Sequence, residues 1–276
     1  MRFILLFALF GISNAFMPIL PKKNLSIRKQ TDLNLFSESA EIVNSLSTNT
    51  ILTQLPFVKK SLTIGGICSS WILGNSLWLG MGFEAWLISL IYFVSGSLVT
   101  KIKFKEKEEA GIAEKRAGRR GPENVFGSGT IPLISSIAIN FLPEYENQLK
   151  LILIASFATK LSDTFASEIG KAYGENCYLI TNLKRVPKGT EGAVSIEGTL
   201  AGLLGAFLIS ISGYELGLIS NVNEIIIINL SAFIATTIES YLGATLQDNK
   251  PWLTNEFINF INTLTGAIVS LILYSN

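Results

Sequence analysis

The sequence predicts an all-α fold: a polytopic integral membrane protein with about seven transmembrane helices, within a range of six to seven, after a cleaved presequence. Of its residues, 49% are hydrophobic and only 16% are charged, whereas a soluble domain carries about 25% charged residues. The mean hydropathy is +0.43. Apolar stretches of spanning length recur along the chain, and basic residues collect in alternate connecting loops, as the positive-inside rule expects.

Residues 1–16 have the organisation of a signal peptide. Arg2 is followed by the apolar run Phe3–Ile12 and by the small-residue sequence Ser13-Asn14-Ala15, which suits cleavage. The run is far shorter than the roughly 20 residues that a membrane span needs. We therefore expect this segment to be removed.

Residues 17–50 resemble a transit peptide, because they contain Lys22, Lys23, Arg28 and Lys29 among Ser and Thr, with no acid before Asp32. A small-residue cleavage site followed directly by Phe16 resembles the bipartite presequences that target proteins into plastids of secondary-endosymbiotic algae. The alternative is a plain secreted or endomembrane protein. We expect a multi-pass plastid membrane protein with its active face towards the stroma.

Residues 57–276 are predicted to form a single polytopic membrane catalytic domain. The predicted spans are about Ser61–Gly80, Phe83–Thr100, Gly129–Leu142, Leu149–Gly170, Ala193–Gly213, Ile225–Leu246 and Phe257–Tyr274. The third is the weakest of these, because it is short and Pro132 interrupts it.

Loop charge supports the third span. Lys59 and Lys60 precede the first span, the loop from Lys101 to Arg120 carries eight Lys and Arg, the loop 171–188 carries four, and Lys250 follows the sixth span. The alternate loops hold Lys150 as their only base, among several glutamates. If all seven stretches cross, every basic loop falls on one side and the C-terminus lies on the other.

Composition also excludes classes of function. A net charge of +1 argues against nucleic acid as a partner. The absence of His excludes His-based zinc sites, His general bases and Ser-His triads, and Cys68 and Cys177 are far apart without metal-ligand neighbours. Any chemistry must use Asp, Glu, Lys, Arg, Ser, Thr and backbone groups. The sequence sets no oligomeric state.

The end of the fourth span holds the first candidate site. Lys160, Asp163 and Ser167 share one helix face, and Glu168 lies close by. Ionisable residues in an apolar helix are functional candidates, because they are costly unless they face a partner or a water-filled cavity. The alternative is a Lys160–Asp163 ion pair that only supports packing.

The loop after this span suits a phosphate ligand. It contains Lys171, Lys184 and Lys188, and then Gly189-Thr190-Glu191-Gly192, whose glycines let backbone N–H groups approach an anion. With Asp163 and Glu168 as oxygen ligands, and with Glu191 as a further candidate, these residues suit a Mg²⁺-nucleotide. Taken alone, the Gly-Thr-Glu-Gly string is a weak signal, and a simple turn is the alternative.

Three further polar groups belong to the same basic side. Arg119 and Arg120, with Glu123 and Asn124, occupy a turn that Gly and Pro fix. The two arginines suit a contact with phosphate; the alternative is that they only set the membrane topology. Glu197 and Glu239 lie in the fifth and sixth spans, and Asn255, Asn259 and Asn262 share one face of the seventh, where interhelical hydrogen bonding is the alternative role. A carrier would place such groups near the bilayer midplane instead.

Two segments have simpler interpretations. Gly198, Ala201, Gly202, Gly205 and Ala206 make a small-residue surface that favours close helix packing. The segment Lys101–Glu109 alternates in charge, which is typical of a solvated or lipid-headgroup face.

From Ser61 to Tyr274 the chain resembles the plant phytyl-phosphate kinase and transmembrane-protein-19-like family. The motifs that carry the resemblance are Gly118–Asn124, Ser162–Lys171, Gly189–Ser195 and Asn259–Leu264. The resemblance implies phosphorylation of phytyl phosphate to phytyl diphosphate for tocopherol synthesis. The order of motifs resembles, more loosely, the CTP-using polyprenol and phytol kinases and the CDP-lipid synthases, which implies Mg²⁺ and CTP, or another nucleoside triphosphate, as cosubstrate.

The expected partners are therefore a prenyl-phosphate lipid and the membrane lipids. In this interpretation Asp163 and Glu168 hold the metal, while Lys171, Lys184, Arg119 and Arg120 neutralise phosphate. Two alternatives remain at this point: a cytidylyltransferase that forms a CDP-lipid, and a non-enzymatic membrane transporter or assembly factor.

Overall fold

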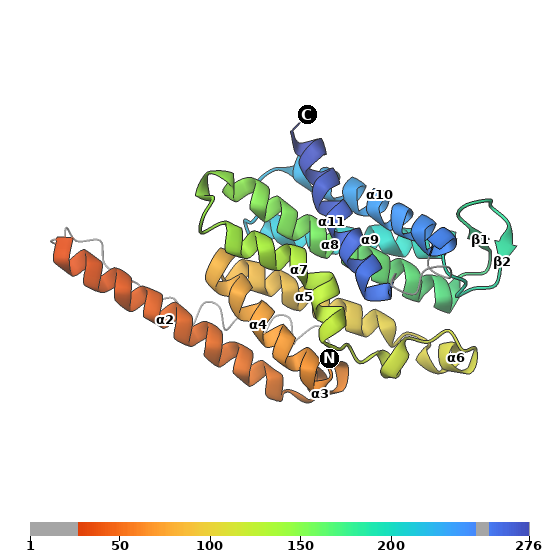
Figure 1. Cartoon of the computed structure of the whole chain (residues 1–276), viewed down its shortest axis with the longest axis horizontal. Coiled ribbons are helices and arrows are strands. Elements are labelled where there is room, and N and C mark those ends of the chain that lie inside the picture. Colours follow the sequence, from red (N-terminus) through yellow and green to blue (C-terminus); the bar gives the residue numbers. More distant parts are fainter. Residues whose placement is uncertain (1–26, 247–253, 276) are drawn as a thin grey trace. The chain divides into compact units, whose positions relative to one another are not determined.

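The computed structural model describes residues 27–246 and 254–275, and within these residues the chain is mostly helical (Figure 1). The predicted signal peptide, the first part of the transit-like segment and Lys250 lie outside the described residues. Contacts divide the chain into two units, residues 1–41 and residues 42–276. The site and the core described below belong to the second unit.

The helices are α2 (Ile27–Gln54), α3 (Pro56–Ser61), α4 (Ile64–Met81), α5 (Phe83–Thr100), α6 (Phe104–Glu109), α7 (Pro122–Ala138), α8 (Glu146–Tyr173), α9 (Ile196–Glu215), α10 (Val222–Leu246) and α11 (Asn255–Tyr274), with short 3₁₀ turns η1 (Lys115–Gly118) and η2 (Pro143–Tyr145). Several of them begin at a side-chain cap. The hydroxyls of Thr63, Ser195 and Thr254 accept hydrogen bonds from backbone N–H groups in the first turns of α4, α9 and α11.

Four described helices, α5, α9, α10 and α11, are long and apolar enough to cross a membrane. This confirms an integral membrane protein that is mainly helical; it does not establish seven spans. The third predicted span differs most from the structure, because α7 begins at Pro122 rather than at Gly129 and ends at Ala138 rather than at Leu142. Its 17 residues extend about 26 Å, close to the thickness of a hydrocarbon core, and they contain Pro132.

Helix α8 lies at the centre of the second unit, where it packs against α5, α7, α9, α10 and α11. Its side chains Leu153, Ile154, Phe157 and Leu161 are almost completely buried. The small-residue surface of α9 packs directly on α8: a Cβ at Gly198 would lie 2.7 Å from the carbonyl oxygen of Ala166. The prediction of close helix packing there is confirmed.

A small antiparallel sheet interrupts the all-helical pattern between α8 and α9. Strands β1 (Cys177–Leu179), β2 (Arg185–Val186) and β3 (Ala193–Val194) pair in the order β2-β1-β3. The chain remains mainly helical, as the predicted all-α class requires, with this short sheet confined to one loop. Figure 1 shows β1 and β2 beyond the helix ends. The sequence showed no strand signal there because the strands are only two or three residues long.

The later part of α2 packs on α4 and α5. The Ser45 hydroxyl donates to Asn75 (2.7 Å), and the indole N–H of Trp86 donates to Asn49 (2.9 Å). Ser45 and Asn49 are buried, so these last residues of the predicted transit-like segment lie within the same compact unit as the membrane helices.

Candidate active site

A polar cavity of 560 Å³ opens among the helix ends on the side of the basic loops. Its walls come from the C-terminal parts of α5, α8 and α10, the N-terminal parts of α7, α9 and α11, and the loops 114–120 and 189–195. Because chain direction alternates between successive long helices, these ends meet on one side. The predicted gathering of polar groups at one face thus has a physical counterpart in this cavity.

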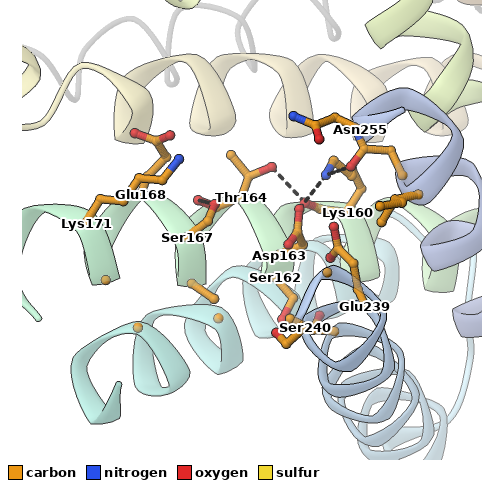
Figure 2. Close-up of a pocket in the computed structure, with 18 of the residues that line it drawn as sticks. Lys160, Ser162, Asp163, Thr164, Ser167, Glu168, Lys171, Glu239, Ser240 and Asn255 are labelled. Carbon is orange, nitrogen blue, oxygen red and sulfur yellow. Dashed lines mark hydrogen bonds and ion pairs between the residues drawn. The ribbon is translucent and has the colours of Figure 1, made fainter. Parts of the chain in front are cut away.

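One charged cluster of the cavity joins three helices. Lys160 of α8 is 7% exposed, forms an ion pair with Asp163 and donates to the side-chain oxygen of Asn259 on α11. The carboxyl group of Glu239 on α10 lies close to that of Asp163. Figure 2 shows the side chains of Lys160, Asp163 and Glu239 directed into the same space.

Asn262 stabilises this cluster from outside the cavity lining. Its amide donates to Glu239 at 2.9 Å, although Asn262 does not line the cavity. Thus Asn259 and Asn262 do make interhelical hydrogen bonds, and their partners Lys160 and Glu239 are ionisable side chains that face the cavity. Asn255, one turn earlier on the same helix, lines the cavity.

Glu168 has a buried partner that sequence reasoning missed. Lys107 of α6 forms an ion pair with Glu168 and donates to the backbone oxygen of Thr100 at 3.0 Å. The Lys107 side chain is 1% exposed, so the prediction of a solvated face for Lys101–Glu109 is wrong at this residue. No sequence pattern indicated that Lys107 is buried, because charged residues flank it on both sides. The packing of α6 on α8 is what buries Lys107 and leaves its charged neighbours exposed.

Arg119 and Arg120 are held by backbone pairing with the segment before α4. The N–H of Arg120 donates to the oxygen of Ser61, and the N–H of Thr63 donates to the oxygen of Arg120, both at 3.0 Å. The Arg120 guanidinium donates to the hydroxyl of Tyr92 at 2.9 Å, and that of Arg119 donates to the oxygen of Leu62 at 3.0 Å. Both arginines line the cavity.

Four cations of the cavity wall have no carboxylate within ion-pair distance in the described part of the chain. They are Lys115, Arg119, Arg120 and Lys171. Lys171 does contribute electrostatically at Asp163. Cavity cations that lack acidic partners suit an anionic ligand, because a polyanion would supply the missing countercharge.

Glu123 and Asn124 have structural contacts. Glu123 forms an ion pair with Arg116 and does not line the cavity. The side-chain oxygen of Asn124 accepts from the backbone N–H of Gly121 at 2.9 Å, which caps α7, and Asn124 also lines the cavity.

The Gly-Thr-Glu-Gly segment lies at the mouth of the cavity, and all four residues line it. Gly189 and Gly192 have φ of +88° and +71°, a conformation that favours glycine. A Cβ at Gly192 would lie 2.5 Å from the backbone oxygen of Ser240, so this glycine also permits close packing on α10.

The remaining predicted residues divide into two groups. Ser167 lines the cavity, whereas Lys184, Lys188 and Glu197 do not, and both lysines are exposed. Cys177 also lines it; burial, with Glu197 nearby, raises the pKa of its thiol, so the thiol is uncharged near neutral pH and poorly suited to act as a nucleophile.

The donors present fit a metal that is shared with a phosphate ligand. Among the described residues no group of three or more Asp, Glu or Cys is placed to hold a metal ion. Asp163 and Glu239 do bring two carboxyl groups together. Mg²⁺ commonly takes one or two carboxylates and completes its coordination with substrate phosphates and water, so this pair suits it, whereas an all-protein calcium cage is not formed.

Comparison with known proteins supports a membrane family found in bacteria, archaea and plants. The chain is 54% identical over 214 residues to an uncharacterized membrane protein of Synechocystis sp., covering 77% of this chain and 83% of the relative. It is 42% identical over 227 residues to the chloroplast protein VTE6 of Arabidopsis thaliana, covering 79% and 67%. It is 35% identical over 219 residues to an uncharacterized membrane protein of Methanocaldococcus jannaschii, covering 79% and 88%.

No solved structure matches the chain. Residues 47–267 match the family described as integral membrane protein DUF92, a range that includes every charged residue of the cavity wall. The family resemblance carried by the motifs is thereby confirmed: this chain belongs to the integral membrane protein family DUF92.

Proposed function

We propose that the protein is a prenyl-phosphate kinase that transfers a phosphoryl group from a nucleoside triphosphate, preferably CTP, to phytyl phosphate. The observation that carries the proposal is the polar cavity, in which a carboxyl pair and cations without acidic partners meet at one end of an apolar helix bundle. A lipid phosphate and a nucleotide must meet at such a boundary. The motif resemblance to phytyl-phosphate kinases supports the choice of acceptor.

The reaction requires positioning and charge compensation more than a base. An oxygen of the lipid phosphate attacks the γ-phosphorus of the donor, and the bond from that phosphorus to the bridging oxygen breaks, which releases the nucleoside diphosphate. The attacking oxygen is already anionic, so the absence of His is no obstacle. Arg119, Arg120 and Lys171 would neutralise the phosphates and hold the two substrates in line.

Asp163 and Glu239 are the residues that would hold Mg²⁺, while Lys160 and Asn262 fix their orientation. The ion would supply countercharge to the phosphates of the donor. The role of Glu168 as a metal ligand stays a prediction, and its buried pairing with Lys107 favours Glu239 in its place.

The proposal extends to location and topology. The 42% identity to a chloroplast protein supports a plastid membrane, in which the cavity faces the stroma and phytyl diphosphate is delivered to tocopherol synthesis. Seven spans, with α4, α7 and α8 crossing beside the four long apolar helices, would place every basic loop on the side of the cavity.

The test is a transfer assay on the purified full chain in detergent, with phytyl phosphate, Mg²⁺ and γ-labelled or base-labelled CTP. Phytyl diphosphate and CDP are the expected products. Formation of CDP-phytyl with release of diphosphate would instead indicate a cytidylyltransferase, and absence of turnover across a panel of prenyl phosphates and nucleotides would refute both enzymes and favour a transporter.

A pair of variants tests whether the activity depends on the cavity. Asp163→Asn should lower kcat by at least about a hundredfold, the scale of losing one preorganised electrostatic group. Glu215→Gln, at an exposed acid near the far end of α9, is the matched control and should keep full activity. Full activity in a folded Asp163→Asn variant would remove Asp163 from the mechanism.

A further inference from the structure

A second, smaller cavity adjoins the polar one. It measures 110 Å³ and lies between α4, α5 and α7, closed by parts of α2 and α8. Its walls are mainly apolar and include Leu52, Leu73, Trp86, Leu90, Phe93 and Phe157. Of the residues that line this cavity, only Arg120 and Asn124 were candidates in the sequence, because most of the others belong to ordinary apolar stretches.

The polar atoms around this cavity are largely paired with protein. The indole N–H of Trp86 donates to Asn49 at 2.9 Å, that of Trp71 donates to Thr50 at 3.1 Å, and the hydroxyl of Ser89 donates to the oxygen of Trp86 at 2.7 Å. A space with apolar walls and satisfied polar groups favours hydrocarbon over water.

Four residues line both cavities: Tyr92, Arg120, Asn124 and Ser128. The Arg120 guanidinium is fixed there, because it donates to the Tyr92 hydroxyl at 2.9 Å and its central carbon lies 5.3 Å from the centre of the same ring. Gly96 leaves room for it, since a Cβ at that position would lie 2.7 Å from a guanidinium nitrogen. A cation without a carboxylate partner thus marks the junction of the polar and the apolar space.

This junction selects an amphiphile whose anionic group is attached directly to hydrocarbon. A nucleotide does not meet this requirement, because its sugar and base are polar on most sides. The cavity is also small compared with the roughly 300–1,000 Å³ of sites that enclose a drug-sized ligand. It therefore has room for only the first part of a long chain, the part next to the phosphate.

We propose that the 110 Å³ cavity binds the phosphate-proximal isoprene unit of the lipid substrate, with Arg120 on its phosphate, while the rest of the chain lies in the bilayer. This inference rests on the proposed function for its choice of ligand. The protein then recognises the first isoprene unit of the lipid, and binding depends little on the length of the rest of the lipid chain.

Photolabelling tests the subsite without requiring turnover. Two phytyl phosphate analogues would carry a diazirine, one in the phosphate-proximal isoprene unit and one at the far end of the chain, and labelled peptides would be mapped by mass spectrometry. The proximal probe should label α4, α5 and α7, and unlabelled phytyl phosphate should compete. The distal probe should not label these cavity residues. Labelling of α9 and α10 by the proximal probe, through Leu203 and Phe233 of the polar cavity, would overturn the proposal.

A pair of identical substitutions on one helix provides the matched variant. Ser70 lines the apolar cavity, so the larger side chain of Ser70→Phe would fill it. Ser76 lies on the same helix but lines neither cavity, so Ser76→Phe is the control. Ser70→Phe should abolish proximal labelling and raise KM for phytyl phosphate about tenfold or more, with kcat much less affected, because the lost burial of several carbons weakens binding. Ser76→Phe should behave as the wild type. Unchanged labelling and KM in a folded Ser70→Phe variant would refute the subsite.

The two proposals fail in different ways. If geranyl and phytyl phosphate give kcat/KM within about tenfold of each other in the wild type, as expected from recognition of the first unit alone, both proposals are supported. Absence of turnover, combined with proximal labelling that Ser70→Phe removes, would refute the kinase and leave the subsite standing. A wild-type enzyme that is active but labelled elsewhere would retain the kinase and remove the subsite.

Discussion

At the scale of single residues, the charges of Lys160 and Glu239 are stable inside an apolar bundle because each has a partner from another helix. Lys160 contacts Asn259, and Glu239 contacts Asn262, so α11 orients groups that belong to α8 and α10. Buried ionisable groups without such partners cost several kcal/mol. A polar residue in one of these helices therefore has to be interpreted together with the helix that faces it.

The Lys107–Glu168 pair gives the sharpest prediction at this scale. Lys107→Met leaves the buried Glu168 carboxylate without a partner, which should cost about 3–5 kcal/mol and lower the melting temperature by roughly 10 °C. The double variant Lys107→Met/Glu168→Leu should recover most of this loss, because an apolar pair of similar volume needs no compensating charge. Thermal unfolding of the purified protein in detergent measures both effects.

Lys105→Met serves as the control, because Lys105 lies on the same short helix and is exposed. It should melt with the wild type. Equal melting temperatures for Lys107→Met and Lys105→Met would show that the buried pair contributes nothing to stability.

At the scale of elements, the position of α9 on α8 depends on glycines that allow the two helix backbones to approach. Gly198→Ala places a Cβ 2.7 Å from the carbonyl oxygen of Ala166, which cannot move without shifting α8. We expect a loss of about 1–3 kcal/mol of stability, despite the gain of up to about 1 kcal/mol in helix propensity. Chemical or thermal unfolding in detergent measures the difference.

Gly170→Ala is the matched control for this prediction. Gly170 belongs to the same interface, but its Cβ would meet its nearest neighbour, the Ser195 hydroxyl oxygen, at an ordinary 3.6 Å. It should be neutral or slightly stabilising. A Gly198→Ala variant as stable as Gly170→Ala would show that the interface yields to the added methyl group.

At the scale of the whole molecule, the arrangement of helix ends predicts the topology. Single cysteines introduced at Glu144 and Asn221, in a variant without Cys68 and Cys177, should react with a membrane-impermeant maleimide from one side of sealed vesicles. Cysteines at Lys105 and Lys184 should react from the other side, because the seven-span arrangement places these loops at the cavity end. Labelling of Glu144→Cys and Lys105→Cys from the same side would show that α7 does not cross the membrane.

The sequence by itself determined the class of the protein, the approximate position of its apolar helices and the side on which its polar residues meet. It did so because hydropathy and the alternation of loop charge are properties that each segment carries alone. It also singled out Asp163, Lys160 and the small-residue surface of α9, since an ionisable residue or a run of glycines is unusual in an apolar helix wherever that helix packs.

Only the tertiary structure decided which of these residues share a cavity and which partners they have. The pairing of Lys107 with Glu168, the closeness of Asp163 to Glu239 and the junction at Arg120 each bring together residues far apart in the chain. Such pairings depend on how helices are ordered and rotated about one another. That arrangement is set by the packing of all their faces together, and no single segment encodes it.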